Sequence, residues 1–365
     1  MIRKLITLVL AVVVIASLVF VGCAKPAPPA PVPTPSPAPA PSPAPAPAPA
    51  TKPIELKFGT GQPPFHPDVE GTDVPWIKLV EDRTNGRVKI TLYAGGALFK
   101  ENQGYQAAVA GLSDIVPTVR VYYTGRFPLS SVLELPLLGI TSSTMGTKVL
   151  MDLYQEFPEI RDEYSDTHML WMNALAPFEI HSTKKPVHTL ADVKGMKMRV
   201  GGGMQSTIVE ALGCTSVTIG GPDTYLALQK GVVDATAMPW EAVRSFKLAE
   251  VTKYHTNVDL FCGVTIVVMN LDTWNSLPPD IQEIFNECSI WGRDHTAQGR
   301  EKAKDEGLVA CEDHEIYTLP PDELQKWQDC LKPLRDKWVA DMQSKGLPGK
   351  EVLEETLRLA KKYSG

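Results

Sequence analysis

Alternating and periodic apolar positions divide the chain into strands and helices from residue 54 onward. The segment 54–60, IELKFGT, alternates polar and apolar side chains and ends near a glycine, which is typical of a strand followed by a loop. The segment 75–86 has helical spacing and closes at Asn85–Gly86, and 88–93 alternates again. A strand, a helix and a second strand in this order predict a β–α–β unit with parallel strands.

The same patterns continue along the rest of the body. We expect strands within 115–117, 168–175, 177–184, 196–200, 215–219, 232–240 and 261–270, and helices within 101–111, 141–157, 204–213 and 222–231. The C-terminal third is helical by its spacing, in segments 276–307, 320–346 (interrupted by Pro333) and 350–365. The chain is therefore predicted to be an α/β protein with an α-rich end.

The N-terminal pattern is that of a targeting segment. Two basic residues are followed by an apolar run from Leu5 to Val21, and Gly22–Cys23 come next. This order predicts a lipoprotein signal peptide over 1–22, with lipidation at Cys23 and a membrane anchor through the lipid. The alternative is an uncleaved transmembrane anchor, since ~17 apolar residues can just span a bilayer. Residues 23–53 are rich in Pro and Ala, which predicts an extended tether.

Charge and cysteine content exclude several classes of function. The net charge of −6 and the lack of basic runs argue against nucleic-acid binding. Apart from Cys23, the five cysteines show no C-x-x-C pair and no recognised Cys/His spacing, so we expect no zinc site. Cys288–Cys311 and Cys311–Cys330 are both candidate disulfides outside the cytoplasm. The motifs GxSxG, HExxH and Walker A are absent, so we expect no enzyme.

A specific resemblance emerges between residues 190 and 285. The segments KGMKMRV (194–200), YLALQKGVVDA (225–235) and NLDTWNSLPPDIQEIF (270–285) resemble the extracytoplasmic solute receptors of TRAP transporters, the DctP-like family. The resemblance covers the body from about residue 54 and implies a two-lobed, periplasmic-binding-protein-like clam-shell with a long helix spanning both lobes. It implies a first lobe from 54–175, a second from 176–260, and completion of the first lobe by 261–365.

The resemblance also implies a ligand-binding arginine. In this family, an arginine in the strand with the pattern K-x-R-V grips the ligand, and that position is Arg199. A planar guanidinium pairs with a carboxylate through two parallel hydrogen bonds, which supports this role. From the residues alone, Arg199 could instead be an exposed charge on an alternating strand.

Several positions depart from better-known members of the family. Met238 stands where acid receptors of the family have an asparagine, and Trp240 is either an apolar wall of the pocket or packing between a lobe and a helix. Gly221 stands where sialic-acid receptors have an aromatic residue, and Glu179 where they have a second arginine. Glu179 would counter an amine, pair with Arg199 or point outward. Sialic acid and C4-dicarboxylates bound by two arginines are therefore disfavoured.

The first lobe offers further candidates. Phe65 and His66 follow the first strand, and either Tyr122 or Tyr123, preferably Tyr122, is expected to face the ligand. We expect no cofactor. Glu179 and Glu101 are weak candidates for a Na⁺ or Ca²⁺ site beside the ligand, because carboxylates suit hard cations.

The expected function is capture of a small organic acid outside the cytoplasmic membrane. The ligand would be a monocarboxylate with apolar character, bound by Arg199 and delivered to the small and large membrane subunits of a TRAP permease. A lipoprotein that presents its ligand to a signalling partner is an alternative, and an extracytoplasmic enzyme is a weaker one.

Overall fold

The computed structural model describes residues 52–364. The expected signal peptide, Cys23 and nearly all of the tether lie outside the described residues. Among residues 52–364, no helix combines the length and the apolar character that crossing a membrane requires.

A five-stranded mixed sheet organises the first lobe. Its order is β2-β1-β3-β10-β4, with bounds β1 Ile54–Gly59, β2 Val88–Tyr93, β3 Ile115–Val119, β4 Thr167–Ala174 and β10 Val264–Asn270. β1 and β2 pair in parallel, which confirms the predicted β–α–β unit, and β10 runs antiparallel between β3 and β4. A strand from late in the sequence therefore completes a sheet begun by the first residues of the body.

Helices and helical turns cover this sheet. They are η1 Val69–Asp73, α1 Val74–Arg83, η2 Glu101–Gln103, α2 Gly104–Val109, η3 Arg120–Tyr122, η4 Ser130–Glu134, α3 Ser143–Glu156, α4 Pro158–Asp162, α8 Leu271–Ser276, α9 Pro279–Val309, α10 Pro321–Ser344 and α11 Gly349–Tyr363. Pro333 lies inside α10 without ending it.

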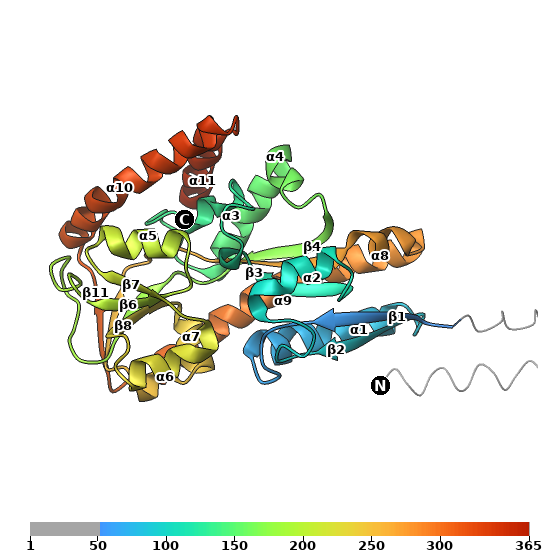
Figure 1. Ribbon diagram of the computed structural model, residues 1–365, viewed down its shortest axis with the longest axis horizontal. Helices are drawn as coiled ribbons and strands as arrows, with labels where there is room; N and C mark the ends of the chain where they lie inside the picture. Colours follow the sequence, from blue (N-terminus) through green and yellow to red (C-terminus); the bar gives the residue numbers. More distant parts are fainter. Residues whose placement is uncertain (1–51, 365) are drawn as a thin grey trace, which may run out of the picture. The chain divides into compact units, whose positions relative to one another are not determined.

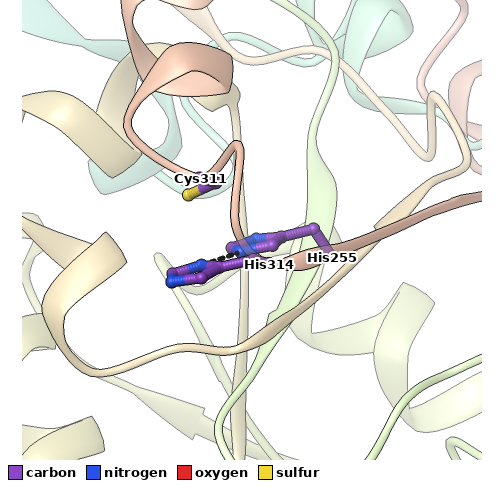
Figure 2. Close-up of side chains that lie close together, drawn as sticks. All are labelled: His255, Cys311 and His314. Atoms are coloured by element: carbon purple, nitrogen blue, oxygen red, sulfur yellow. Dashed lines mark hydrogen bonds between the residues drawn. The ribbon is translucent and has the colours of Figure 1, made fainter.

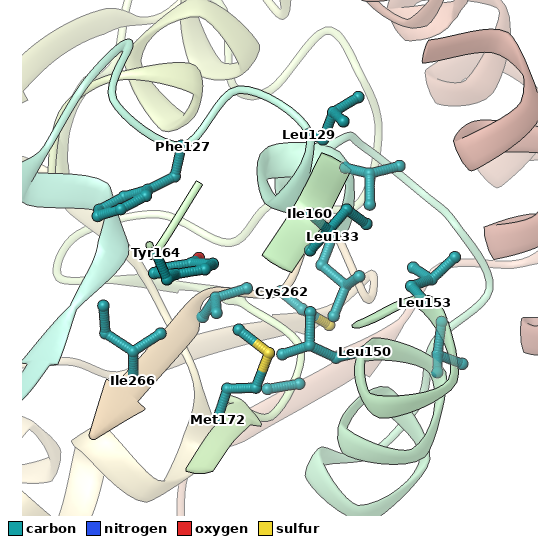
Figure 3. Close-up of a cluster of buried hydrophobic side chains, with 14 of the residues drawn as sticks. Phe127, Leu129, Leu133, Leu150, Leu153, Ile160, Tyr164, Met172, Cys262 and Ile266 are labelled. Atoms are coloured by element: carbon teal, nitrogen blue, oxygen red, sulfur yellow. The ribbon is translucent and has the colours of Figure 1, made fainter. Parts of the chain in front are cut away.

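Strand alternation gives the first sheet two apolar faces. On β10, Val264, Ile266 and Val268 join the core against α3 and α11, which includes Phe127, Leu150 and Tyr164 (Figure 3). Val267 and Met269 join a second core with Trp76 and Phe285 of α1 and α9. Strands of a sheet that is buried on both faces have nearly continuous apolar sequences, and FCGVTIVVMN (261–270) is such a sequence.

A six-stranded sheet organises the second lobe. Its order is β11-β9-β5-β8-β6-β7, with bounds β5 Glu179–Ser182, β6 Lys197–Val200, β7 Thr215–Thr218, β8 Ala235–Met238, β9 Tyr254–Asn257 and β11 Glu315–Thr318. Its helices and turns are α5 Met204–Ala211, η5 Gly221–Asp223, α6 Thr224–Gln229, α7 Trp240–Ser245 and η6 Leu248–Glu250. β11 pairs with β9 and so belongs to the second sheet. The expected division at residue 260 assigned this segment to the first lobe.

Two antiparallel segments and the helices α9 and α10 connect the lobes, with Trp338 of α10 in the first-lobe core and Trp327 in the second-lobe core. Residues 175–178 and 258–263 are joined by backbone hydrogen bonds, including Phe178 N–H to the Phe261 carbonyl at 2.8 Å. The helix α9 contacts both lobes (Figure 1). The Trp76 indole of the first lobe donates to the Cys288 carbonyl at 3.0 Å. At Gly307, a Cβ would lie 2.2 Å from the Trp240 carbonyl oxygen, so only glycine permits this approach to α7. The predicted lobe-spanning helix is thereby confirmed.

Candidate ligand-binding cavity

A cavity of about 570 Å³ lies between the lobes. The first lobe contributes the loop after β1 and the end of β3, the second lobe contributes the ends of β6 and β8, and α9 contributes one flank. Apolar side chains form much of its wall: Val119, Val121, Leu175, Phe178, Met238, Ala242, Phe246 and Ala303. This volume and lining are typical of a small-molecule site.

Arg199 lies at the cavity, near the end of β6. Its Nε and Nη2 both donate to the Ile219 carbonyl, at 2.8 and 2.6 Å, which fixes the plane of the guanidinium. Two of its five N–H donors are used in this way, which leaves three for a ligand. These two hydrogen bonds hold the Arg199 guanidinium in place before a ligand binds, so little side-chain entropy is lost on binding.

The charge of Arg199 has no acidic partner within residues 52–364. The side chain is only 3% exposed, and burial lowers its pKa to about 10, opposed by the nearby Tyr122. The guanidinium is still protonated at neutral pH. A desolvated cation without a counter-ion is costly, and an incoming carboxylate would offset that cost.

Tyr122 approaches from the other lobe. It lines the cavity in η3, and Arg199 lines the same cavity from the second lobe. Burial raises the pKa of Tyr122 to about 12, with Glu101 adding to the rise and Arg199 opposing it, so its hydroxyl is a donor at neutral pH. Tyr123 instead lies in the core, where its hydroxyl accepts from the Tyr105 N–H at 2.9 Å.

A second arginine, Arg300 of α9, reaches the cavity. Its Nη2 lies 2.8 Å from Asp68 Oδ2 and its Nε lies 4.0 Å from Glu241 Oε1, and the same side chain donates to Thr265 and to the Ala174 carbonyl. The sequence interpretation missed this residue. A signal for it exists: Thr296, Arg300, Ala303 and Gly307 recur at helical spacing along the buried stripe of α9.

One of the two acids balances the charge of Arg300, and the other is mostly neutral. Burial raises the pKa of Asp68, but Arg300 lowers it further, so the carboxyl is ionised and balances the guanidinium. Burial raises the pKa of Glu241 to about 8, against the opposing effect of Arg300, so this carboxyl is mostly protonated at neutral pH. The cavity thus has one neutral half around Arg300 and one positive half around Arg199.

The family model that matches this chain is the bacterial extracellular solute-binding protein, family 7 (DctP), over residues 58–341. The chain belongs to the DctP family. A monocarboxylate 2-oxoacid-binding periplasmic protein of Nostoc is 27% identical to it over 227 residues, which span 58% of this chain and 59% of that protein.

Two solved structures with the same fold carry aromatic acids. A TRAP solute binding protein from Rhodoferax ferrireducens, in complex with copurified benzoate, is 29% identical, with a TM-score of 0.77, and the match covers 85% of this chain and 98% of that one. A TRAP periplasmic solute binding protein from Bordetella bronchiseptica, with bound (R)- and (S)-mandelate, is 25% identical, with a TM-score of 0.78 and coverage of 85% and 99%. The two-lobed fold of this DctP-family protein is thereby confirmed.

An aromatic ring does reach the cavity of this DctP-family protein, from an unexpected position. A Cβ at Gly221 would lie 3.0 Å from the ring of Phe246, so the glycine leaves room for that side chain. Phe246 lines the cavity and faces His66 of the first lobe, with ring centroids 6.0 Å apart. Gly221 and Met238 both line the cavity as expected, and no feature of the sequence near Gly221 indicates Phe246.

Three expected residues lie away from the cavity lining. Trp240 is buried with its indole donating to Asn257 Oδ1 at 2.8 Å, so it packs α7 within the second lobe and does not form a wall. Glu179 Oε2 accepts the N–H groups of Val258 and Asp259, at 2.6 and 3.1 Å, which fixes the segment connecting the lobes. Phe65 is 69% exposed, whereas its neighbour His66 lines the cavity.

The two acids expected to hold a hard cation are not brought together. Glu101 lines a separate small cavity of about 50 Å³, whose lining does not include Glu179. Burial raises the pKa of Glu101 to about 7, with Gln62 opposing. Neither expected disulfide forms, because the five cysteines of the described residues are all free.

Proposed function

We propose that this protein is the solute-binding receptor of a TRAP-type transporter for a monocarboxylic acid with an apolar, aromatic body. The acid binds between the lobes and passes to the small and large membrane subunits of the permease. The observation that carries the proposal is Arg199, a rigid, buried cation with no acidic partner in the described chain. A ligand carboxylate supplies the missing charge through bidentate hydrogen bonds.

The charge balance of the cavity favours one carboxylate over two. Arg300 is already matched by Asp68, and the neighbouring Glu241 is mostly neutral. A second ligand carboxylate near Arg300 would meet Asp68 and would have to displace it. The apolar walls and Phe246 suit an aromatic or branched body, and two proteins of the same fold carry benzoate and mandelate.

The lobes supply a means of retaining the ligand. Val121 and Tyr122 come from one lobe, and Arg199 and Phe246 from the other, so a ligand that contacts both sides stabilises the closed arrangement. Among the described residues, the segments 175–178 and 258–263 and the helices α9 and α10 connect the lobes. The expected lipid anchor at Cys23 would hold the receptor at the outer face of the cytoplasmic membrane.

A calorimetric titration with matched acids and amides tests the proposal. The protein is first unfolded and refolded to remove any copurified ligand, and is then titrated with benzoate, mandelate, benzamide and succinate. We expect an acid to bind at least about 100-fold more tightly than its amide, because each hydrogen bond to a charged group contributes about 1.5–3 kcal/mol. Equal affinity for benzoate and benzamide, or a preference for succinate, would contradict it.

A further inference from the structure

Two histidines and a cysteine meet on the second lobe, outside the ligand cavity. His255 lies on β9, and Cys311 and His314 lie in the turn between α9 and β11 (Figure 2). One nitrogen of each ring and the Cys311 sulfur all lie within 4.8 Å of one another. His255 and Cys311 are buried, whereas His314 is half-buried.

A chain of hydrogen bonds fixes the tautomer of each ring. His181 Nε2 lies 3.0 Å from the Met238 carbonyl, which can only accept, so this nitrogen carries the proton and His181 Nδ1 is bare. His255 Nδ1, 2.8 Å from that bare nitrogen, must then donate to it. His255 Nε2 is consequently left without a proton, and its lone pair is directed toward His314.

This arrangement is the one in which metal-binding histidines occur. Such a histidine binds the metal through one ring nitrogen and usually donates the N–H of the other to a fixed acceptor. This hydrogen bond orients the ring and selects the tautomer. His181 provides that acceptor for His255 and is itself held by the Met238 carbonyl. The orienting contact is therefore complete before any metal arrives.

We propose that His255 Nε2, His314 Nδ1 and Cys311 Sγ bind a Zn²⁺ ion, with water as the fourth ligand. Two imidazoles and a thiolate suit a borderline metal such as zinc and do not suit Mg²⁺ or Ca²⁺, which require oxygen. The half-buried position of His314 leaves one side open to solvent. No zinc site is expected from the sequence when Cys311-x-x-His314 is overlooked as a Cys/His spacing. The third residue, His255 on β9, lies more than fifty residues earlier in the chain, so the sequence pattern does not indicate it.

Metal binding requires small and local changes. His255 Nε2 and His314 Nδ1 are 3.0 Å apart, whereas two nitrogens bound tetrahedrally at ~2.0–2.1 Å are about 3.3 Å apart. The His314 ring turns, and its proton moves from Nδ1 to Nε2. Lys253 Nζ, now 3.2 Å from His314 Nε2, then loses its acceptor and turns toward solvent. The Cys311 thiol releases its proton to water as the Zn–S bond forms.

The thiol makes the site selective. The Cys311 side chain is fully buried, so a metal must bind thiolate strongly to displace the thiol proton. Once bound, the ion joins the turn at the C-terminal end of α9 to β9. We expect it to stabilise this lobe by mass action, to an extent set by the free Zn²⁺ concentration.

Cobalt serves as a spectroscopic probe in the full-length chain, purified with no polyhistidine tag. We expect one equivalent of Co²⁺ to produce a thiolate-to-cobalt charge-transfer band and the intense visible bands of tetrahedral cobalt. Added Zn²⁺ should displace the Co²⁺ and so remove both sets of bands. Cys311→Ser should abolish the charge-transfer band, whereas Cys330→Ser, which changes a described thiol outside the cluster, should retain it.

Two further variants should change the Zn²⁺ affinity in opposite directions. His314→Gln, at a half-buried position that tolerates change, should weaken Zn²⁺ binding by at least about 100-fold, since even an outer-shell partner contributes 10–100-fold. Lys253→Met removes a cation beside the site and should strengthen binding severalfold. Absence of the charge-transfer band from the parent chain, or its persistence in Cys311→Ser, would overturn the proposal. So would unchanged Zn²⁺ affinity in His314→Gln.

Discussion

The cavity contains two buried arginines whose surroundings differ. Arg300 has Asp68 at 2.8 Å and Glu241 at 4.0 Å, whereas Arg199 has only the Ile219 carbonyl and the nearby Tyr122. Both side chains are almost completely buried. The cost of desolvating Arg300 is therefore offset within the protein, and that of Arg199 is left to the ligand.

This difference supports a structural role for Arg300 and the proposed ligand-binding role for Arg199. Arg300 joins α9 to the loop containing Asp68, to β10 through Thr265 and to the Ala174 carbonyl at the end of β4. Arg199 is held by one carbonyl and has three free donors. A count of arginines in the cavity would suggest a dicarboxylate site, whereas the pattern of their partners indicates a monocarboxylate.

The largest expected effect concerns the stability of the Arg300 half. Arg300→Met should lower the free energy of unfolding by about 3 kcal/mol, because it leaves the Asp68 carboxylate without its cation. This loss of stability is near the lower end of the range for breaking a buried ion pair, because the Asp68 side chain is 30% exposed. Chemical denaturation measures it. Adding Asp68→Asn to Arg300→Met should recover part of the loss, and no recovery would show that the pairing with Asp68 matters little.

A smaller effect should follow pH through Glu241. Its pKa is about 8 in the fold and near 4.5 when unfolded, so between these values the folded chain holds a proton that the unfolded chain has lost. The free energy of unfolding therefore falls as pH rises, by about 2 kcal/mol between pH 5 and 7 from this group. The free energy of unfolding of the Glu241→Gln protein, measured by chemical denaturation, should fall less steeply with pH than that of the parent protein. An equal pH dependence in the two proteins would show that Glu241 contributes nothing.

The smallest effect concerns the shape of the apolar wall near Phe246. Phe246→Leu should weaken binding of an aromatic acid by about 1 kcal/mol and should affect an aliphatic acid less, since aromatic contacts contribute 0.5–1.5 kcal/mol beyond area. Gly221→Ala should act in the same direction, because its Cβ would lie 3.0 Å from the ring. Calorimetry with both acids measures the difference. An equal loss for the two acids would show that the ring provides no aromatic selectivity.

Local patterns predicted much of the fold. Val88–Tyr93 has the predicted bounds, and the helices that begin at Pro279 and Pro321 start within the predicted segments 276–307 and 320–346. β9, β11 and α7 were not predicted, because each is short and its position depends on pairing or packing with distant segments. β11 in particular becomes a strand only by pairing with β9, about sixty residues earlier.

The site was predicted less completely than the fold. The resemblance led to Arg199 and Met238, and strand geometry to Tyr122, all of which line the cavity. Glu179 and Trp240 instead find partners inside the protein, at Val258 and Asn257, and sequence does not reveal which partner a side chain will choose. Arg300 and Phe246 reach the cavity from α9 and from beyond α7, where only the tertiary arrangement places them.

The most direct test of the central claim compares Arg199→Met with Arg335→Met by calorimetric titration of the best-binding acid. Arg335 is a control because it is partly buried and, like Arg199, donates to backbone carbonyls, at Pro136 and Leu137, but does not line the cavity. We predict that Arg199→Met keeps its far-ultraviolet circular dichroism and loses at least about 100-fold in affinity, or about 3 kcal/mol, whereas Arg335→Met binds as the parent does. Unchanged affinity in a folded Arg199→Met protein would contradict the account.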